Sequence, residues 1–457
     1  MVNGKALEVV LNTRKAVLAR NSGESLDVLL RLRAHVKEEV GRTRTPLAVS
    51  LVIDRSGSMN GNKLEEAKRC ALDLLNRLQD SDQVSVIIYD DTVEVLLETM
   101  SAQIAKTLLP IRLEEVEPRG MTNLHGGWLS GAQSLAPLVS PMASRASNVM
   151  SRVILLSDGQ ANKGITSVEA ICAHVRELAS AGVTTSTVGI GFGFNEELMT
   201  AIATAGQGNS WYGQRAQDLA ESFDAEMGFL TSLVWQDVRV HLQTPLLSHM
   251  GQIKVRNDYV KNAGGQYCLP SIAAGSEVWM AISLSMSEVI HLQDNGSALR
   301  CIILAKDKAG IQHEFTVAMP QLPVVELPDY RLATVDELVA RRFNEVEAAD
   351  IQREARAHVQ RRNWDGVERL IGQLEERSRD NPWLMETVQY LRKLLERRDH
   401  ETMEKELMYS SDKLKNRATS LNDSILFCMA DEAVKPAFLR KKVSQGRNTD
   451  SQNDAKK

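Results

Sequence analysis

The sequence is poor in cysteine, and its few cysteines form no recognisable pattern. The five residues are odd in number, widely separated and without a C-x-x-C pair: Cys70, Cys172, Cys268, Cys301 and Cys428. This spacing disfavours a disulfide framework and a zinc site, and it is typical of a reducing compartment. The chain shows no apolar signal core near its start and no apolar run near the ~18 residues that a membrane span needs. We therefore expect a cytoplasmic protein without a transmembrane segment.

The sequence also lacks a strong excess of either charge. It has 54 basic and 59 acidic residues among 457, a net charge of −5. A general nucleic-acid-binding surface is therefore not expected. Hydrophobic residues make up 43% of the chain, an ordinary globular content that excludes global disorder. The length corresponds to about three domains.

The short motifs of common enzyme classes are missing as well. The chain has no G-x-x-x-x-G-K-[ST] phosphate-binding loop and no G-x-S-x-G nucleophile elbow. The segment His400–Glu404 begins like a zinc-protease motif but lacks the second histidine. We therefore expect a protein that is not an enzyme.

In the middle of the chain, short and wholly apolar runs alternate with amphipathic segments. The runs cover 47–54, 84–90, 152–158 and 184–191, and the amphipathic segments cover 63–78, 124–139 and 168–182. Strands that are buried on both faces lose their polar alternation because helices cover those faces. The pattern therefore predicts a doubly wound (Rossmann-like) α/β domain with a mainly parallel sheet.

The flanking segments have other patterns. Residues 6–40 and 232–325 alternate apolar and polar positions, which predicts half-buried antiparallel strands. Because the first segment is too short to bury a core alone, we expect it to complete a β-sandwich-like domain into which the α/β domain is inserted. The predicted organisation is N-terminal strands at 1–45, the α/β domain at 46–231, the β-sandwich-like domain at 232–328, a C-terminal α-helical region at 333–420 and a disordered tail at 443–457.

Oxygen-bearing side chains occur where the predicted strands end. A D-x-S-x-S pattern ends the first run, a G-x-T pattern precedes the segment at 124, and S-D-G ends a later run; the candidate ligands are Asp54, Ser56, Ser58, Thr122 and Asp158. Ligands of open α/β sheets bind beyond the carboxyl ends of the strands, so we expect these side chains to converge. Hydroxyls and carboxylates, without His or Cys, suit Mg²⁺ or Mn²⁺.

This set of motifs, in this order, resembles the metal-ion-dependent adhesion site (MIDAS) of von Willebrand factor A (VWA) domains. The resemblance covers about 46–231, and the flanking parts are similar to bacterial proteins in which such a domain lies within a longer chain. It implies that the three hydroxyls ligate the metal directly, while Asp54 and Asp158 act mainly through water. It also implies an open sixth position for an Asp or Glu of a partner protein.

Three residues beside the motifs are candidates for a rim that contacts this partner: Arg55, Asn123 and His125. Arg55 fills a variable position of the first motif and adds positive charge there. His125 lies three positions after Thr122, although a capping or surface role is its ordinary alternative.

Three functions are compatible with these motifs. The first is a non-enzymatic interaction module, a regulatory or assembly factor that grips a partner's acidic residue through the metal. The second is a metal-dependent hydrolase that uses the same carboxylates, and the third is a metal-independent scaffold acting through the helical region. A purely structural reading also exists, in which Ser58 and Thr122 cap helices and Asp158 forms a turn. The order of the three motifs at strand-to-helix junctions favours the metal site.

Overall fold

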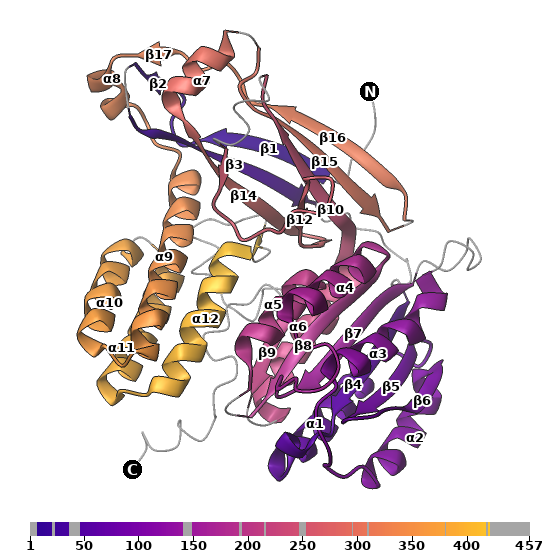
Figure 1. The fold of residues 1–457 in the computed structure, drawn as a ribbon. Helices are drawn as coiled ribbons and strands as arrows, with labels where there is room; N and C mark the ends of the chain where they lie inside the picture. Colours follow the sequence, from indigo (N-terminus) through magenta and orange to yellow (C-terminus); the bar gives the residue numbers. More distant parts are fainter. Residues whose placement is uncertain are drawn as a thin grey trace. The chain divides into compact units, whose positions relative to one another are not determined.

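The computed structural model describes residues 7–20, 23–35, 46–139, 149–191, 194–213, 216–245, 253–294, 296–308, 310–379, 381–416 and 419–420. These residues form two compact units (Figure 1). We call residues 46–232 the α/β unit, and residues 7–35 with 233–420 the β–helical unit. The polar tail predicted at 443–457 lies outside the described residues.

The α/β unit is built on a six-stranded sheet with the order β6-β5-β4-β7-β8-β9. Its strands are β4 (Leu47–Asp54), β5 (Gln83–Tyr89), β6 (Val93–Ser101), β7 (Met150–Ser157), β8 (Val183–Ile190) and β9 (Gln207–Gly213). All neighbouring pairs are parallel except β5 and β6, which are antiparallel. The sheet is therefore mixed, with one antiparallel edge strand that the sequence pattern did not reveal.

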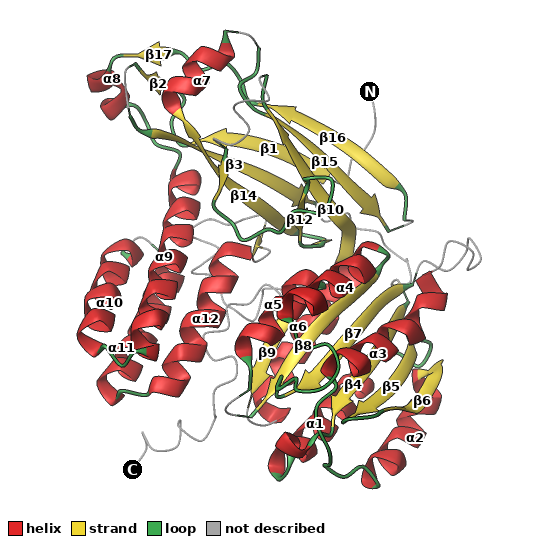
Figure 2. Ribbon diagram, viewed as in Figure 1, coloured by secondary structure: helices red, strands yellow, loops and turns green. Residues whose placement is uncertain are grey.

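Helices cover both faces of this sheet (Figure 2). They are α1 (Asn62–Arg77), α2 (Ala102–Glu114), α3 (Leu124–Val139), α4 (Val168–Ser180), α5 (Glu196–Ala205) and α6 (Ala216–Ser232), and a single 3₁₀ turn, Gly57–Met59, precedes α1. The central strands β4 and β7 are buried along their whole length, which explains their unbroken apolar sequence.

Two glycines let α3 approach the sheet closely. A Cβ atom on Gly127 would lie 2.3 Å from Cδ1 of Tyr89, and one on Gly131 would lie 2.4 Å from Cγ2 of Val52. Since α3 follows the Thr122 loop directly, this close packing fixes the height of that loop above the sheet.

The β–helical unit begins with two sheets packed face to face. One has the order β1-β3-β14-β11, from β1 (Leu7–Thr13), β3 (Ser25–Ala34), β14 (Ser276–Ser285) and β11 (Lys254–Val255), with β18 (Thr419–Ser420) also paired to β14. The other has the order β12-β10-β15-β16, from β12 (Tyr267–Leu269), β10 (Leu233–Gln243), β15 (Arg300–Asp307) and β16 (Gln312–Ala318), with β13 (Ile272–Ala273) also paired to β10. Inward side chains of both sheets form one apolar core. Strands from before and after the α/β unit thus share a sandwich, because β3 pairs with β14.

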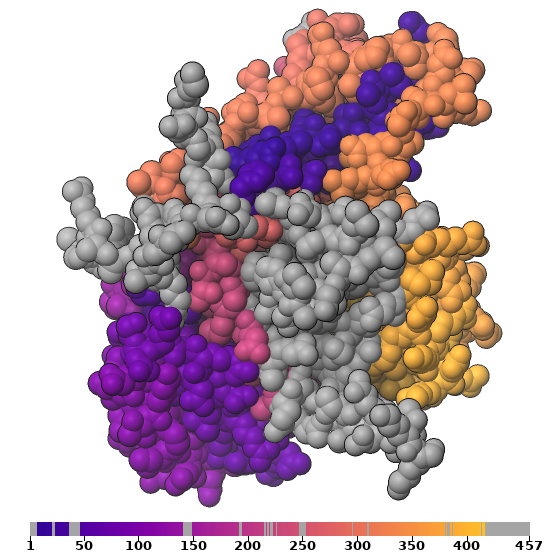
Figure 3. All heavy atoms as spheres, turned by 180° about the vertical axis from the view of Figure 1, so that it is seen from behind, coloured from indigo at the N-terminus to yellow at the C-terminus, as the bar shows by residue number. Residues whose placement is uncertain are grey.

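Smaller elements close one end of the sandwich. They are β2 (Leu18–Ala19), β17 (Val324–Val325), α7 (Met286–Gln293) and α8 (Leu327–Leu332). The parallel pair β2–β17 joins segments about 300 residues apart in the chain, and in Figure 3 the indigo N-terminal residues lie beside orange residues of this later stretch.

The helical region consists of α9 (Glu337–Gln360), α10 (Trp364–Ser378), α11 (Pro382–Arg397) and α12 (His400–Asn416). The first of these helices lies on the outer face of the β1–β3–β14–β11 sheet, where Val339, Phe343 and Val346 pack against Leu29 and Trp279. The helical region is thus part of the same compact unit as the sandwich.

A buried charge cluster strengthens this junction. Arg342 of α9 pairs with Glu345 at 2.8 Å and Glu277 of β14 at 3.4 Å, and its guanidinium lies 5.0 Å from the ring centre of Trp279. Glu277 also accepts a 2.7 Å ion pair from Arg31. Within the described residues, no helix is both long enough and apolar enough to cross a membrane.

Candidate functional site

The loop after β4 brings three of the predicted ligands together. Asp54 is the last residue of the strand and is fully buried, and its Oδ1 accepts a 2.8 Å hydrogen bond from the Ser56 amide. The chain then turns into the 3₁₀ segment, which places Ser58 Oγ 3.1 Å from Ser56 Oγ. Two hydroxyls and one carboxylate therefore lie within a single turn.

The end of β7 supplies the second carboxylate. Strand β7 is adjacent to β4, and Ser157 Oγ donates a 2.6 Å hydrogen bond to Asp54 Oδ2. The next residue, Asp158, is fully buried, and its negative charge acts on Asp54. Gly159 follows at φ +69°, a conformation that favours glycine, and its amide donates to Ser157 Oγ.

The Thr122 loop is hydrogen-bonded to the loops that follow both of these strands. The Gly57 amide donates a 3.1 Å hydrogen bond to the Gly120 carbonyl, which joins this loop to the one after β4. Thr122 is buried, its amide donates to Asn162 Oδ1 at 2.7 Å, and its carbonyl accepts from the amides of Asn162 and Lys163. The structure thus joins all three motif loops by direct hydrogen bonds.

Burial dominates the electrostatics of this site. It raises the pKa of Asp54 to about 6, and the neighbouring Asp158 adds to the rise, although hydrogen bonds from Ser157 and Ser56 oppose it. Burial, together with the charge of Asp54, also raises the pKa of the Tyr89 hydroxyl well above its usual value. Within the described structure, this buried hydroxyl has no hydrogen-bond partner of normal geometry. The site is therefore rich in buried oxygen atoms, and no cation from the described part of the chain pairs with Asp54.

One cation reaches the site from α1. Lys63 Nζ lies 3.0 Å from Asp158 Oδ2, whose other oxygen accepts the Gln160 amide at 3.4 Å. All four oxygens of the two carboxylates therefore already accept a hydrogen bond or an ion pair. This geometry gives no support to the hydrolase alternative, which needs a free and positioned base.

Arg55, the first rim candidate, is almost completely buried. Its guanidinium donates to Asp90 at 2.9 Å and to Glu94 at 3.0 Å, while its amide donates to the Tyr89 carbonyl. Burial alone would raise the pKa of Asp90, but hydrogen bonds from Arg119 and Thr92 and the charge of Arg55 hold it well below its usual value. The more exposed cation beside Asp90 is Arg119, at 2.7 Å.

The other two rim candidates also make internal contacts. Asn123 caps the start of α3, since its Oδ1 accepts the Gly126 amide at 3.1 Å. His125 is only 7% exposed, and its Nε2 lies 2.9 Å from Nδ1 of His174 on α4. Partner contact by Arg55, Asn123 or His125 stays a prediction, and this arrangement engages all three within the domain.

The residues present fit a hard divalent cation. The donors are hydroxyl and carboxylate oxygens, which Mg²⁺ and Mn²⁺ prefer, and among the described residues no cation pairs with the buried Asp54. No group of three or more His, Cys, Asp or Glu side chains able to hold a metal occurs in the described part of the chain. The site offers only two carboxylates, so any ion there would depend on the hydroxyls.

Sequence reasoning missed four side chains that shape this site. Ser157 and Tyr89 lie against Asp54, Lys63 pairs with Asp158, and Asn162 holds Thr122. Ser157 stood inside the S-D-G motif and could have been identified from it. The others come from separate elements, and only the fold brings them to the site.

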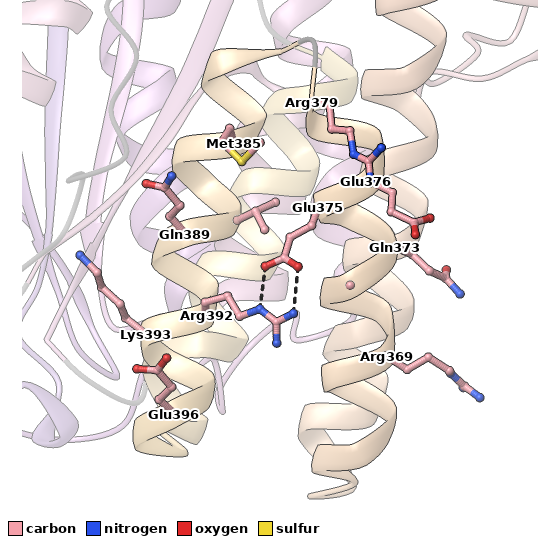
Figure 4. Close-up of a pocket in the computed structure, with 12 residues that line it drawn as sticks. Arg369, Gln373, Glu375, Glu376, Arg379, Met385, Gln389, Arg392, Lys393 and Glu396 are labelled. Atoms are coloured by element: carbon pink, nitrogen blue, oxygen red, sulfur yellow. Dashed lines mark hydrogen bonds and ion pairs between the residues drawn. The ribbon is translucent and has the colours of Figure 1, made fainter.

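A hollow, separate from the proposed metal site, lies in the helical region between α10 and α11. Its volume is about 1020 Å³, and its lining residues include Arg369, Gly372, Glu375, Arg379, Arg392 and Lys393. Figure 4 shows the Glu375 carboxylate and the Arg392 guanidinium facing each other between the helices, in a two-pronged pair at 2.7 and 2.9 Å. A Cβ atom on Gly372 would meet nothing within 4 Å, so this position borders open space.

Comparison with known proteins identifies the α/β unit. The family model of the von Willebrand factor type A domain matches residues 49–225. An uncharacterised protein of Synechocystis is 27% identical over 230 residues, which make up 49% of this chain and 51% of that protein. The human inter-alpha-trypsin inhibitor heavy chain H3 is 28% identical over 193 residues, 41% of this chain and 21% of that protein. The chain thus spans about half the length of the first relative and much less of the second.

Solved structures share the fold over most of the chain. The von Willebrand factor type A protein from Catenulispora acidiphila has a TM-score of 0.65 at 17% identity, covering 91% of this chain and 98% of that one. The ArnB paralog VWA2 from Sulfolobus acidocaldarius has a TM-score of 0.57 at 15% identity, covering 90% and 99%. Together with the sheet order and the matched family model, these similarities show that the chain contains a von Willebrand factor type A domain, with a mixed α/β sheet and an additional C-terminal helical region.

Proposed function

We propose that the VWA domain binds Mg²⁺ or Mn²⁺ through Asp54, Ser56, Ser58, Thr122 and Asp158, and captures an acidic side chain of a partner protein. VWA domains act as protein–protein interaction modules, and the metal-dependent mode is our proposal for this chain. The observation that supports it is that hydrogen bonds join the three motif loops beside two buried carboxylates, with Ser56 Oγ and Ser58 Oγ 3.1 Å apart.

The proposed division of labour follows from these contacts. Ser56, Ser58 and Thr122 provide neutral oxygens, while Asp54 and Asp158 provide charge from the buried side. A bound divalent ion supplies positive charge that these neutral oxygens leave incompletely balanced, so an acidic group from outside is attracted. Hydrogen bonds within the chain hold the proposed ligands in place: the Ser56 amide and the Ser157 hydroxyl bind the Asp54 carboxylate, and Asn162 binds the Thr122 amide.

Magnesium titration by calorimetry tests the first half of the proposal. We expect Thr122→Ala to lose Mg²⁺ binding while keeping the circular dichroism of the wild type, because it removes one hydroxyl from a position set by backbone hydrogen bonds. Thr107→Ala is the matched control, since Thr107 is exposed on α2. If Thr122→Ala binds Mg²⁺ as tightly as the wild type, the Thr122 hydroxyl is not a ligand and the proposed metal site is wrong.

An array of synthetic peptides tests the second half. Each acidic peptide is paired with a copy in which Asn and Gln replace Asp and Glu, and binding is measured with Mg²⁺ or EDTA. We expect binding that needs both the acid and Mg²⁺. Peptides retained equally in EDTA would contradict capture through the ion.

The hollow between α10 and α11 favours a second candidate function, the metal-independent scaffold. Its lining carries cations and carboxylates together, so it suits a partner segment with charges of both signs rather than a small apolar ligand. The helix-interior glycine that borders it, Gly372, leaves space for close approach of another chain.

A filling substitution tests this alternative without touching the VWA domain. Gly372→Trp places a large side chain in the hollow, and Gly372→Ala is its control, because it leaves most of the space open. If partner binding goes through the helical region, Gly372→Trp abolishes it and EDTA has no effect. The opposite pattern supports the metal-dependent mode.

A further inference from the structure

Lys63 is the one side chain that places a positive charge on a carboxylate of the proposed metal site, among the described residues. It is the second residue of α1, and its Nζ lies 3.0 Å from Oδ2 of Asp158. The carboxylate is completely buried, and the lysine is 26% exposed. The pair is therefore largely shielded from water, where an ion pair is stronger than at an exposed surface.

The position of this lysine is fixed by more than the ion pair. A Cβ atom on Gly191 would lie 3.2–3.5 Å from the Cγ, Cδ and Cε atoms of Lys63, so the aliphatic stem lies directly against this glycine. Gly191 has φ +78° in the loop after β8, a conformation that other residues rarely adopt. The stem thus runs between α1 and the β8 loop, and its ammonium group points at Asp158.

The charged side chains that the structure describes at this site do not balance one another. The site holds two buried carboxylates, and the negative charge of Asp158 acts on Asp54. Asp54 accepts hydrogen bonds from the Ser56 amide and the Ser157 hydroxyl, which carry no net charge. Lys63 therefore neutralises one of two negative charges, and a divalent ion beside it would be repelled by its ammonium group.

We propose that Lys63 is a tethered cation that holds Asp158 when no divalent ion is bound and that competes with the ion for this carboxylate. The inference rests on the proposed metal-binding function and adds a regulation to it. The lysine keeps the empty site folded and, by the same contact, weakens the affinity for the ion. The site can then release its ion without unfolding.

Replacement of Lys63 by methionine separates the two effects. Lys63→Met keeps the stem against Gly191 and removes the charge. We expect its Mg²⁺ affinity to rise on the order of ten-fold, because one repelling charge is lost from a site of low dielectric constant. In EDTA we expect its melting temperature to fall by about 5 °C, because the buried Asp158 is left without its cation. Saturating Mg²⁺ restores the melting temperature to that of the wild type.

Two further variants serve as controls. Lys63→Arg keeps the charge, so its Mg²⁺ affinity stays within a few-fold of that of the wild type. Lys68→Met removes the same charge from the same helix, but Lys68 pairs with Glu65 on the surface, so neither affinity nor melting temperature follows the Lys63→Met pattern.

Calorimetry with Mg²⁺ and thermal melts in EDTA and Mg²⁺ decide the matter. Higher affinity together with an EDTA-specific loss of stability in Lys63→Met alone supports the proposal. Unchanged affinity, or a loss of stability that Mg²⁺ does not repair, overturns it. If the Lys63 proposal fails but the wild type binds Mg²⁺ and Thr122→Ala does not, the proposed metal-binding function still stands. If neither wild type nor Lys63→Met binds Mg²⁺, both the proposed function and the competition fail.

Discussion

Gly127 in α3 provides a direct test of how packing against the sheet supports the loops that carry the proposed metal ligands. In α3, a Cβ atom on Gly127 would lie 2.3 Å from Cδ1, 2.4 Å from Cγ and 2.9 Å from Cβ of Tyr89. Ordinary contacts between such atoms are near 3.5–4.0 Å, so about 1 Å of movement is needed. Tyr89 is fully buried at the end of the internal strand β5, and it cannot easily give way. We expect Gly127→Ala to push α3 away from the sheet.

The size of the effect follows from two opposing contributions. Overpacking a tight core typically costs about 1–3 kcal/mol, and replacing a helical glycine by alanine returns about 0.5–1 kcal/mol. The middle of both ranges gives a net loss of about 1 kcal/mol, or about 2–4 °C in the melting temperature of a domain of this size. Because α3 continues the Thr122 loop and the Tyr89 carbonyl accepts the Arg55 amide, the displacement also disturbs two motif loops. Mg²⁺ affinity should therefore fall together with stability.

Gly372→Ala is the matched control for this prediction. It is the same change inside another helix, α10, but its Cβ meets nothing within 4 Å. We expect it to stabilise the protein by about 0.5–1 kcal/mol and to leave Mg²⁺ binding unchanged. Thermal melts followed by circular dichroism and calorimetric Mg²⁺ titrations measure both quantities. If Gly127→Ala is as stable as the wild type, or if both variants shift in the same direction, the packing argument is wrong.

Three further predictions concern single side chains. Ser157→Ala removes the 2.6 Å hydrogen bond to Asp54, and we expect calorimetry to show about ten-fold weaker Mg²⁺ binding, as for other residues that orient metal ligands. Arg342→Met leaves Glu345 and Glu277 buried without this partner, and we expect urea denaturation to show a loss of about 3 kcal/mol in the free energy of unfolding. The control is Arg353→Met, which should lose less than ~1 kcal/mol because the pair with Asp258 is partly exposed. Burial and the nearby His174 lower the pKa of His125. As the pH falls through about 6.5, the unfolded chain therefore takes up a proton before the folded chain does, and stability is lost. Thermal melts between pH 7 and 5 should show a smaller loss of stability for His125→Gln than for the wild type.

Most of the fold of the α/β unit could be predicted from the sequence, because its central strands are buried on both faces. The apolar run at 47–54 corresponds to β4, and the amphipathic segments at 63–78 and 124–139 correspond to α1 and α3 within one residue. The edge strand β6 was missed, since only one of its nine residues is buried and its sequence carries no continuous apolar run. Patterns of hydrophobicity report burial, and an edge strand has little of it.

Only part of the candidate site could be predicted from the sequence. Motif residues such as Asp54 and Asp158 could be named because strand ends of a parallel sheet share one edge. The partner of each could not be named, since Lys63 on α1 reaches Asp158 across 95 positions of sequence. The burial of Arg55 was equally hidden, because it depends on Asp90 and Glu94 of another hairpin.

The helical region cannot be tested as an isolated fragment, and this affects how the scaffold alternative is judged. Phe343 and Val346 of α9 pack on Trp279 of the sandwich, and Arg342 pairs there with the buried Glu277. Cutting the chain before α9 would expose these apolar surfaces and separate Arg342 from Glu277, so failure of the fragment to bind a partner would reflect lost structure. Substitutions at Gly372 in the full chain avoid this problem, because they act on the hollow and leave the junction intact. Comparing the Gly372 variants with Thr122→Ala in the same binding assay distinguishes a partner bound by the helices from one bound through the metal.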